Sequence, residues 1–238
     1  MTEEAGADRP RPGEGGVFGR RTGRKLHSTQ SVLMRELLPR LAIGPNDDLT
    51  RDALFPSAAE LRLEIGFGGG EHLAHHAGHR PTAGFIGCEP FRNGVAKFLE
   101  LADAKALTNV GIWNGDAGLL IDRLPTGSLA GVDLFYPDPW PKRRQRKRRF
   151  VSDDILHRLA RVMAQGTMLR FATDIDDYAG WTLARVRRSP HFAWEPTTAD
   201  DWRQPWPDWP STRYEAKALR EGRPPVYLSI VRNGQSAD

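Results

Sequence analysis

The sequence predicts an α/β fold: a doubly wound sheet of seven strands with helices on both faces. Three observations lead to this prediction. Short apolar runs alternate with amphipathic helical patterns along most of the chain. A glycine-rich turn, residues 66–70, joins the first strand to a helix. Acidic residues follow several strands at their carboxyl ends, where such a sheet binds its ligands.

The composition is that of a chain able to bury a core. Of its 238 residues 39% are hydrophobic, and the formal charge is +4 with a pI near 9.4. Cys88 is the only cysteine, so an intrachain disulfide or a cysteine-based zinc site is excluded. No apolar run approaches the ~18 residues of a membrane span, and no signal-peptide pattern is present. We therefore expect a cytoplasmic protein that is not bound to a membrane.

Residues 1–25 are rich in Gly, Pro, Arg and Glu, which predicts a flexible basic tail. Its second half, residues 19–25, is either solvated or an arm that contacts RNA or folds over a cofactor. Residues 26–238 are expected to form a single domain. The sequence indicates no obligate protein partner, and both a monomer and a homodimer are compatible with it.

Alternation and turn residues predict strands at 61–67, 85–89, 110–114, 132–136, 166–172, 192–194 and 226–231. Helices with one apolar face are expected at 31–41, 71–78, 92–107, 152–163 and 176–187. The last two strands are joined by a long connection, residues 197–225. Connections of this length are usually functional or disordered, and its three tryptophans argue against disorder.

The turn after the first strand reads Gly66-x-Gly68-x-Gly70, with Glu64 two residues before it. A dinucleotide fingerprint would need a glycine where Glu71 stands, so that motif is absent. Glycines here let backbone N–H groups approach a ligand closely, although a plain tight turn is the alternative.

Two further acids follow the next two strands. Glu89, after the second strand, can accept two hydrogen bonds from ribose hydroxyls, or can simply be a surface acid. Asp116, after the third strand, is a good helix N-cap and can also face a ligand. Cys88 is expected to face the core.

The fourth strand leads into the central stretch of the chain, residues 135–149. Asp138 stands between two prolines, so its backbone is held extended at the strand end. Trp140 follows and can stack on a base or wedge into the core. Seven of the eight residues from Lys142 to Arg149 are cationic, and such a run is not expected to pack in a core. A rigid acid, an indole and a cation patch suit a nucleobase attached to phosphates.

Four histidines, His72, His75, His76 and His79, fall on the helix that follows the glycine turn, at a spacing that metal ligands use. No cysteine accompanies them, and a solvated face is the simpler interpretation. We expect no metal site.

The motifs occur in the order seen in the bacterial tRNA (guanine-N7-)-methyltransferases, which the chain resembles over residues 18–232. These motifs are Leu63 to Gly68, Gly115-Asp116-Ala117, Pro137-Asp138-Pro139-Trp140 with Lys142 and the following arginines, Ala172-Thr173-Asp174, and Thr212-Arg213-Tyr214-Glu215. The resemblance implies a Rossmann-like class I methyltransferase fold. It also implies transfer of methyl from S-adenosylmethionine to N7 of guanine 46 in the tRNA variable loop.

The resemblance also implies residue roles, with Asp138 as the catalytic residue. The cofactor would be contacted by Glu64, Gly66, Gly68, Glu89, Asp116 and Asp138. The substrate would be contacted by Lys142, Asp174, Thr212, Arg213, Tyr214 and Glu215. RNA would be contacted by Arg144, Arg146, Lys147, Arg148 and Arg149. The chain departs from the family pattern at Pro141 and in the sequence Cys88-Glu89-Pro90, neither of which touches a predicted catalytic group.

Two alternatives remain from the sequence. The first is another nucleic-acid methyltransferase that acts on an rRNA or DNA base. The Asp-Pro-Pro-aromatic order of adenine amino methylation differs from the Pro-Asp-Pro-Trp order found here. The second is a non-catalytic RNA-binding protein that retains the fold, against which the intact acids argue.

Overall fold

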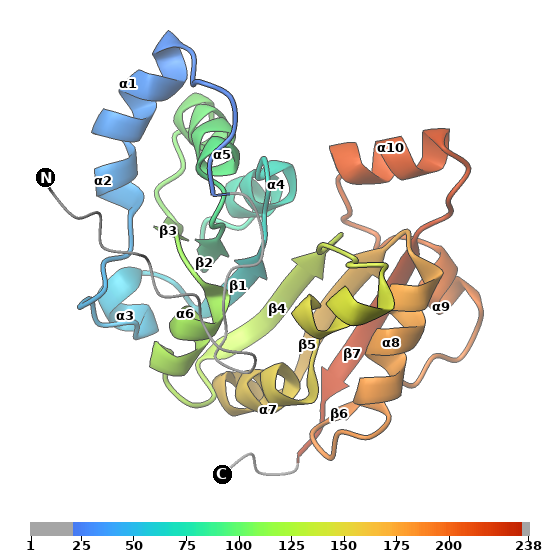
Figure 1. The fold of residues 1–238 in the computed structure, drawn as a ribbon. Coiled ribbons are helices and arrows are strands. Elements are labelled where there is room, and N and C mark those ends of the chain that lie inside the picture. Colours follow the sequence, from blue (N-terminus) through green and yellow to red (C-terminus); the bar gives the residue numbers. More distant parts are fainter. Residues whose placement is uncertain (1–20, 235–238) are drawn as a thin grey trace, which may run out of the picture.

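The computed structural model describes residues 21–234, whose seven strands form one sheet (Figure 1). The strands are β1 (Glu60–Ile65), β2 (Ala83–Cys88), β3 (Val110–Trp113), β4 (Leu129–Phe135), β5 (Met163–Thr173), β6 (Phe192–Ala193) and β7 (Val226–Arg232). Their order across the sheet is β3-β2-β1-β4-β5-β7-β6. Strands β1 to β5 pair in parallel, whereas β7 runs antiparallel to both of its neighbours.

Helices cover both faces of the sheet, which confirms the predicted doubly wound fold (Figure 1). The helices are α1 (Ser28–Glu36), α2 (Leu38–Leu41), α3 (Arg51–Leu54), α4 (Glu71–His79), α5 (Arg92–Ala104), α6 (Ala117–Arg123), the 3-10 helix η1 (Arg143–Arg148), α7 (Asp153–Val162), α8 (Asp176–Val186), α9 (Asp200–Arg203) and α10 (Arg213–Arg220). Helices α4 and α5 pack on one face and α6 to α8 on the other. No described helix is long and apolar enough to cross a membrane.

The predicted strands all form, with ends shifted by a few residues, but the long connection 197–225 contains two helices that were not predicted, α9 and α10. Thr212 caps α10, its Oγ1 accepting from the Glu215 backbone N–H at 3.2 Å. Threonine followed three residues later by glutamate is the pattern of a capping box, so the sequence carried this signal. The predicted tail is described only from residue 21 onward.

A row of charged side chains crosses the centre of the sheet on the face that α4 covers. Glu64 on β1 is in register with Asp133 on β4, and Asp133 with Arg170 on β5. All three are buried. The Arg170 guanidinium donates to both oxygens of Asp133, at 2.7 and 2.9 Å. His72 of α4 completes the row, with Nδ1 2.7 Å from Glu64 and Nε2 3.3 Å from Arg170.

The contacts of this row determine which atoms donate and which accept hydrogen bonds. A guanidinium only donates, so His72 Nε2 accepts from Arg170 and His72 Nδ1 carries the proton that it donates to Glu64. Burial by itself raises the pKa of the Asp133 carboxyl, but the charge and hydrogen bonds of Arg170 outweigh burial and hold that pKa below its usual value. The row is therefore a paired, hydrogen-bonded ionic layer within the sheet.

We expect Arg170→Met to reduce the free energy of unfolding by about 3–5 kcal/mol, because it leaves Asp133 as a buried charge without its partner. The double variant Asp133→Leu/Arg170→Met should regain most of this loss, since apolar side chains often replace a buried ion pair at little cost. Urea unfolding at neutral pH measures both. A double variant no more stable than the single one would contradict the pairing.

Candidate active site

The carboxyl ends of β1 and β2 bring the glycine turn against Glu89. The Gly68 N–H donates to Glu89 Oε2 at 2.7 Å, and the Phe91 N–H donates to Oε1 at 2.8 Å. Burial raises the pKa of Glu89, the two N–H groups oppose the rise, and the nearby Asp138 carboxylate adds to it. Glu89 thus lies beside the turn and within electrostatic range of Asp138, with β1 between the strands β2 and β4 that these two acids follow.

The turn needs its glycines for conformation and for space. Gly66 and Gly68 have φ of +71° and +57°, a region that other residues rarely enter. A Cβ on Gly66 would meet nothing within 4 Å, so the backbone there is open to a ligand. A Cβ on Gly94 of α5 would lie 2.4 Å from the Gly68 carbonyl oxygen, so close approach of helix and turn depends on that glycine as well.

Asp116 follows β3 and caps α6, accepting from the Leu119 N–H at 3.1 Å. The cap uses Oδ1. The neighbouring Asn114 donates from its side chain to the Glu89 carbonyl at 2.6 Å and so ties the ends of β2 and β3 together. The carboxylates of Glu89 and Asp116 therefore stand on adjacent strand ends.

Glu64 lies deeper than the other predicted cofactor acids. Its side chain is 6% exposed and binds His72 within the ionic row. Glu64, His72 and Asp133 together offer three metal-ligating atoms within 4.8 Å of one another. The guanidinium of Arg170 already binds Asp133 and His72, and its positive charge opposes a cation at this position.

Asp138 stands at the end of β4 on an exposed loop, where partial burial raises the pKa of its carboxyl. The loop bends sharply, since Tyr136 and Trp140 both have positive φ, +50° and +41°. The Trp140 ring is partly buried and has the Arg148 guanidinium 5.0 Å from its centre.

The cationic run divides into exposed residues and one buried anchor. Lys142, Arg143 and Arg144 line a surface hollow of about 660 Å³. Arg149 is buried, donating to the Pro139 carbonyl at 2.8 Å and pairing with Asp177 of α8. The prediction that Arg149 contacts RNA does not fit this placement, nor does the expectation that no residue of the run would pack in the core.

Arg149 instead pins the loop that carries Asp138 to α8. Its guanidinium also lies about 5 Å over the rings of Tyr178 and Trp181. The sequence does not distinguish it from its neighbours, because its partners come from residues far along the chain. Arg146 also pairs with Asp177, at 2.9 Å, but is only partly buried.

Helix α10 brings Arg213 and Tyr214, from the predicted substrate segment 212–215, over the glycine turn. A Cβ on Gly68 would lie 3.3 Å from the Tyr214 ring, and Arg213 Nε is 3.4 Å from Glu71. Glu215 lies instead against β7 and the long connection. Its buried carboxylate accepts from Trp209 Nε1 at 2.8 Å and from the Tyr227 hydroxyl.

Asp174 follows β5, and its Oδ2 accepts from Arg223 Nε at 2.8 Å.

The structure gathers Asp138, Glu89 and the start of α10 at one edge of the sheet. Electrostatic coupling of Tyr214 to both Glu89 and Asp138 reflects this proximity, although burial is the main cause of the raised pKa of Tyr214.

The basic segment before α1 also reaches this edge. The Arg21 carbonyl accepts from the Arg92 N–H at 2.9 Å, and the Gly23 N–H donates to Asn93 Oδ1 at 2.7 Å. Asn93 in turn donates to the Arg24 carbonyl at 2.7 Å. The described end of the segment thus docks at the start of α5, just after Glu89, and Asn93 is a residue that sequence reasoning missed.

Sequence reasoning also missed the partners of the histidine face. His72 lies among the rings of Phe135 and Trp209, at centroid distances of 4.6 and 5.2 Å. His76 is buried with Nδ1 3.6 Å from Asp208. Burial first, then the charges of neighbouring groups, lower the pKa of His76 to about 3. Polar residues on alternate positions of buried strands were the available signal for this cluster.

Comparison with known proteins identifies close relatives. A family model described as "Putative methyltransferase" matches residues 58–228. A tRNA (guanine-N(7)-)-methyltransferase of Brucella anthropi is 50% identical over 235 residues, covering 98% of this chain and all of that protein. The enzyme of the same name from Azorhizobium caulinodans is 51% identical over 220 residues, covering 92% of this chain and 96% of that one.

Solved structures share the fold at low identity. The 16S rRNA methyltransferase KamB aligns with a TM-score of 0.50 and 13% identity, over 76% of this chain and 91% of that one. A precorrin-6y C5,15-methyltransferase from Geobacter metallireducens gives the same score and identity, over 89% and 94%. These likenesses show the fold alone.

The neutral, buried His76 predicts a pH dependence of stability. Its pKa is about 3 in the folded protein, against 6.5 for an ordinary histidine. Between these values the unfolded chain binds more protons, so the free energy of unfolding falls as the pH drops through this window. Urea unfolding at about pH 7 and about pH 5 should show the fall, and His76→Phe should reduce it. The exposed His79 serves as control: an equal reduction by His79→Phe would contradict this assignment.

Proposed function

The chain belongs to the tRNA (guanine-N(7)-)-methyltransferase family, and from this premise we propose that it methylates N7 of guanine 46 in the tRNA variable loop, with S-adenosylmethionine as donor. The observation that carries the proposal is the meeting of Glu89, the glycine turn, Asp138 and α10 at one edge of the sheet. Relatives at about 50% identity over nearly the whole chain bear the same name.

The residues present fit the proposed donor. Glu89 and Asp116 offer carboxylate oxygens with spare lone pairs, which suit ribose hydroxyls and an adenine amino group. Gly66 leaves open space beside the backbone, where an amino-acid group could approach. When bound, S-adenosylmethionine supplies an electrophilic methyl group on a positively charged sulfur. Glu64 is buried below the turn and binds His72, so it would support the cofactor site indirectly.

The reaction asks little proton chemistry of the protein. Guanine N7 is an unprotonated acceptor, so no base is needed to free its lone pair. Positive charge moves onto the purine as the methyl is transferred, and a fixed carboxylate beside the ring stabilises that charge. We assign this role to Asp138. Asp174 and Glu215, each held by protein donors but retaining lone pairs, would orient the guanine edge together with the rest of the Thr212–Glu215 segment.

The exposed cations would bind the RNA backbone. Lys142 and Arg144 line the surface hollow that follows the Asp138 loop in the chain, and Lys147 and Arg148 continue the exposed surface along η1. Trp140 beneath Arg148 would form a flat platform on which a base can stack, a contact worth about 1–3 kcal/mol.

The first prediction concerns the product. Incubation with radiolabelled S-adenosylmethionine and unmodified tRNA transcript should place label in N7-methylguanine of the variable loop. Nuclease digestion and chromatography identify the labelled nucleotide. Label in an adenine, or transfer to rRNA or DNA in place of tRNA, would favour another nucleic-acid methyltransferase. Cofactor binding without any transfer would favour a non-catalytic protein.

Asp138→Asn should lower kcat by about 10²-fold or more, the scale of losing one preorganised electrostatic group. Its affinity for tRNA should change little, because the exposed cations remain. Single-turnover methylation and a filter-binding titration measure the two quantities separately. Near-normal turnover with normal RNA binding would remove Asp138 from its catalytic role.

The salt dependence of tRNA binding distinguishes exposed from buried arginines. With about six phosphate contacts the slope of log K against log salt should be roughly −4 by the single-strand rule, and Arg144→Ala should reduce its magnitude by about 0.7. Arg149→Ala should leave the slope of the folded fraction unchanged and lower the free energy of unfolding instead. A slope near zero for the parent protein would exclude the patch from the RNA site.

A further inference from the structure

We propose that Asp208 is a positioning residue that fixes a turn of the long connection against α4 and β5 and thereby holds Glu215 in place. This rests on the proposed function, because Glu215 is there assigned to the guanine. The turn consists of residues 206–209 and is called the tryptophan turn below. Neither the family motifs nor the catalytic argument uses Asp208.

The tryptophan turn is a β-turn. The Trp209 N–H donates to the Trp206 carbonyl at 3.0 Å, and Pro207 occupies the second position, which proline favours. Asp208 occupies the third position of this turn, and its side chain is exposed. The tryptophan turn is therefore a hydrogen-bonded segment that carries one charged side chain, Asp208, called the tip below.

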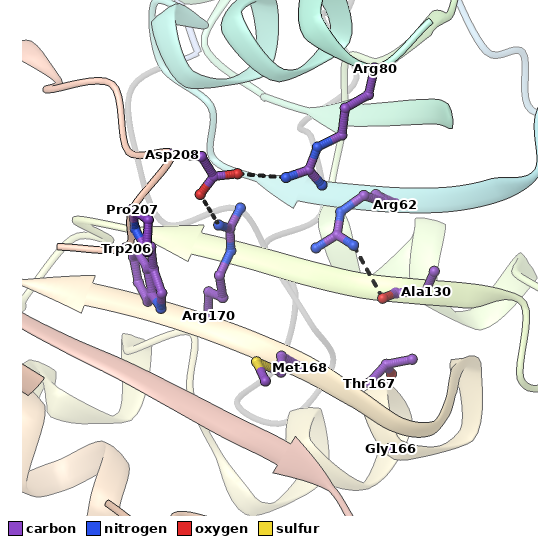
Figure 2. A pocket seen from close by; sticks show the side chains of 10 residues that line it. All are labelled: Arg62, Arg80, Ala130, Gly166, Thr167, Met168, Arg170, Trp206, Pro207 and Asp208. Carbon is purple, nitrogen blue, oxygen red and sulfur yellow. Dashed lines mark hydrogen bonds and ion pairs between the residues drawn. The ribbon is translucent and has the colours of Figure 1, made fainter. Parts of the chain in front are cut away.

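The tip lies among cations from two elements that are far apart in the sequence (Figure 2). Asp208 Oδ2 is 2.5 Å from Arg80 Nη2, just after α4, and 3.6 Å from His76 Nδ1. Its other oxygen is 3.7 Å from Arg170 Nη1. Burial by itself raises the pKa of Asp208, but the surrounding charges, among them the Arg170 and Arg80 guanidinium groups, outweigh burial and lower that pKa, so the tip is charged.

The hollow around the tip makes this carboxylate difficult to replace. It has a volume of about 400 Å³ and is lined by Arg62, Arg80 and Arg170, with Asp208 the one acid among its lining residues in the described chain. An isolated exposed ion pair contributes little to stability. Here a neutral side chain would leave the Arg80 and Arg170 guanidinium groups without the carboxylate that both contact.

The indoles on either side of Asp208 connect the tryptophan turn to β7 and to α10. Trp206 Nε1 donates to Ser229 Oγ at 2.8 Å on β7, and Trp209 Nε1 donates to Glu215 Oε2 at 2.8 Å. An indole has a single donor, so a small rotation of the turn breaks the bond to Glu215. Only two residues separate Trp209 from Thr212, the N-cap of α10.

Helix α10 has few other attachments. Its buried residues are Glu215 and Ala218, and the Arg213–Glu71 pair is partly exposed. Tyr227 binds Glu215 from the sheet and Trp209 binds it from the turn. Loss of the Asp208 contacts therefore releases one of the two donors that orient the carboxylate.

Hydrogen exchange of the free protein tests, without reference to activity, whether Asp208 holds the tryptophan turn and α10 in place. In Asp208→Asn, the peptides spanning residues 209–218 should exchange several-fold faster than in the parent, because the Ala216 N–H that bonds to Thr212 becomes less protected. Asp200→Asn is the matched control: it makes the same charge change at an exposed acid of the same connection and should leave these peptides unchanged. Unchanged exchange in Asp208→Asn, or equal acceleration in the control, overturns the proposal.

Kinetics then test the consequence. Asp208→Asn should lower kcat/KM for tRNA about tenfold, the effect of losing one hydrogen bond to a charged group, and Asp208→Glu should recover part of it. In a Glu215→Gln background Asp208→Asn should add little, since both act on one carboxylate contact. Additive losses overturn the proposal. A parent protein that methylates no tRNA refutes the proposed function, whereas the exchange result still decides whether Asp208 holds α10.

Discussion

The bidentate ion pair between Asp133 and Arg170 is the constraint on which one half of the molecule depends. Two charges at the centre of a sheet must be hydrogen-bonded completely, because the interior penalises any lone pair or proton left over. His72 and Glu64 use the remaining capacity on one side, and the tryptophan turn covers Arg170 on the other. The polar face of α4 and the long connection are thus required by the sheet as much as by the site.

The site itself separates two tasks in space. Carboxylates stand at consecutive strand ends, where the glycine turn leaves backbone exposed, and cations stand outside them on η1. The loop that joins the two regions is held by the buried Arg149, which binds the Pro139 carbonyl and Asp177, and by Arg148, whose guanidinium lies over the Trp140 ring. A substrate that carries a flat ring and phosphates meets both surfaces only if this loop is rigid.

The sequence predicted the features that local pattern determines. Alternation located every strand, and the acids at strand ends identified the edge where Glu89 and Asp138 meet. It did not predict features that depend on distant partners. Arg149 is identical in type to its neighbours and differs through its burial against the Pro139 carbonyl and the rings of α8. His72 has metal-ligand spacing but binds Glu64 and Arg170. Helix α10 was missed although Thr212 and Glu215 form a capping pattern, because the connection was interpreted through its tryptophans and prolines.

The antiparallel strand β7 has a consequence for biosynthesis. It inserts between β5 and β6, and its residues Tyr227 and Ser229 bind Glu215 and Trp206. A chain emerging from the ribosome has made all the parallel strands, the glycine turn and the cationic run before this strand is available. Glu215 and Trp206 are therefore made before their partners on β7 exist. On the proposed function, the guanine site would be complete only after Tyr227 and Ser229 of this last strand have been synthesised.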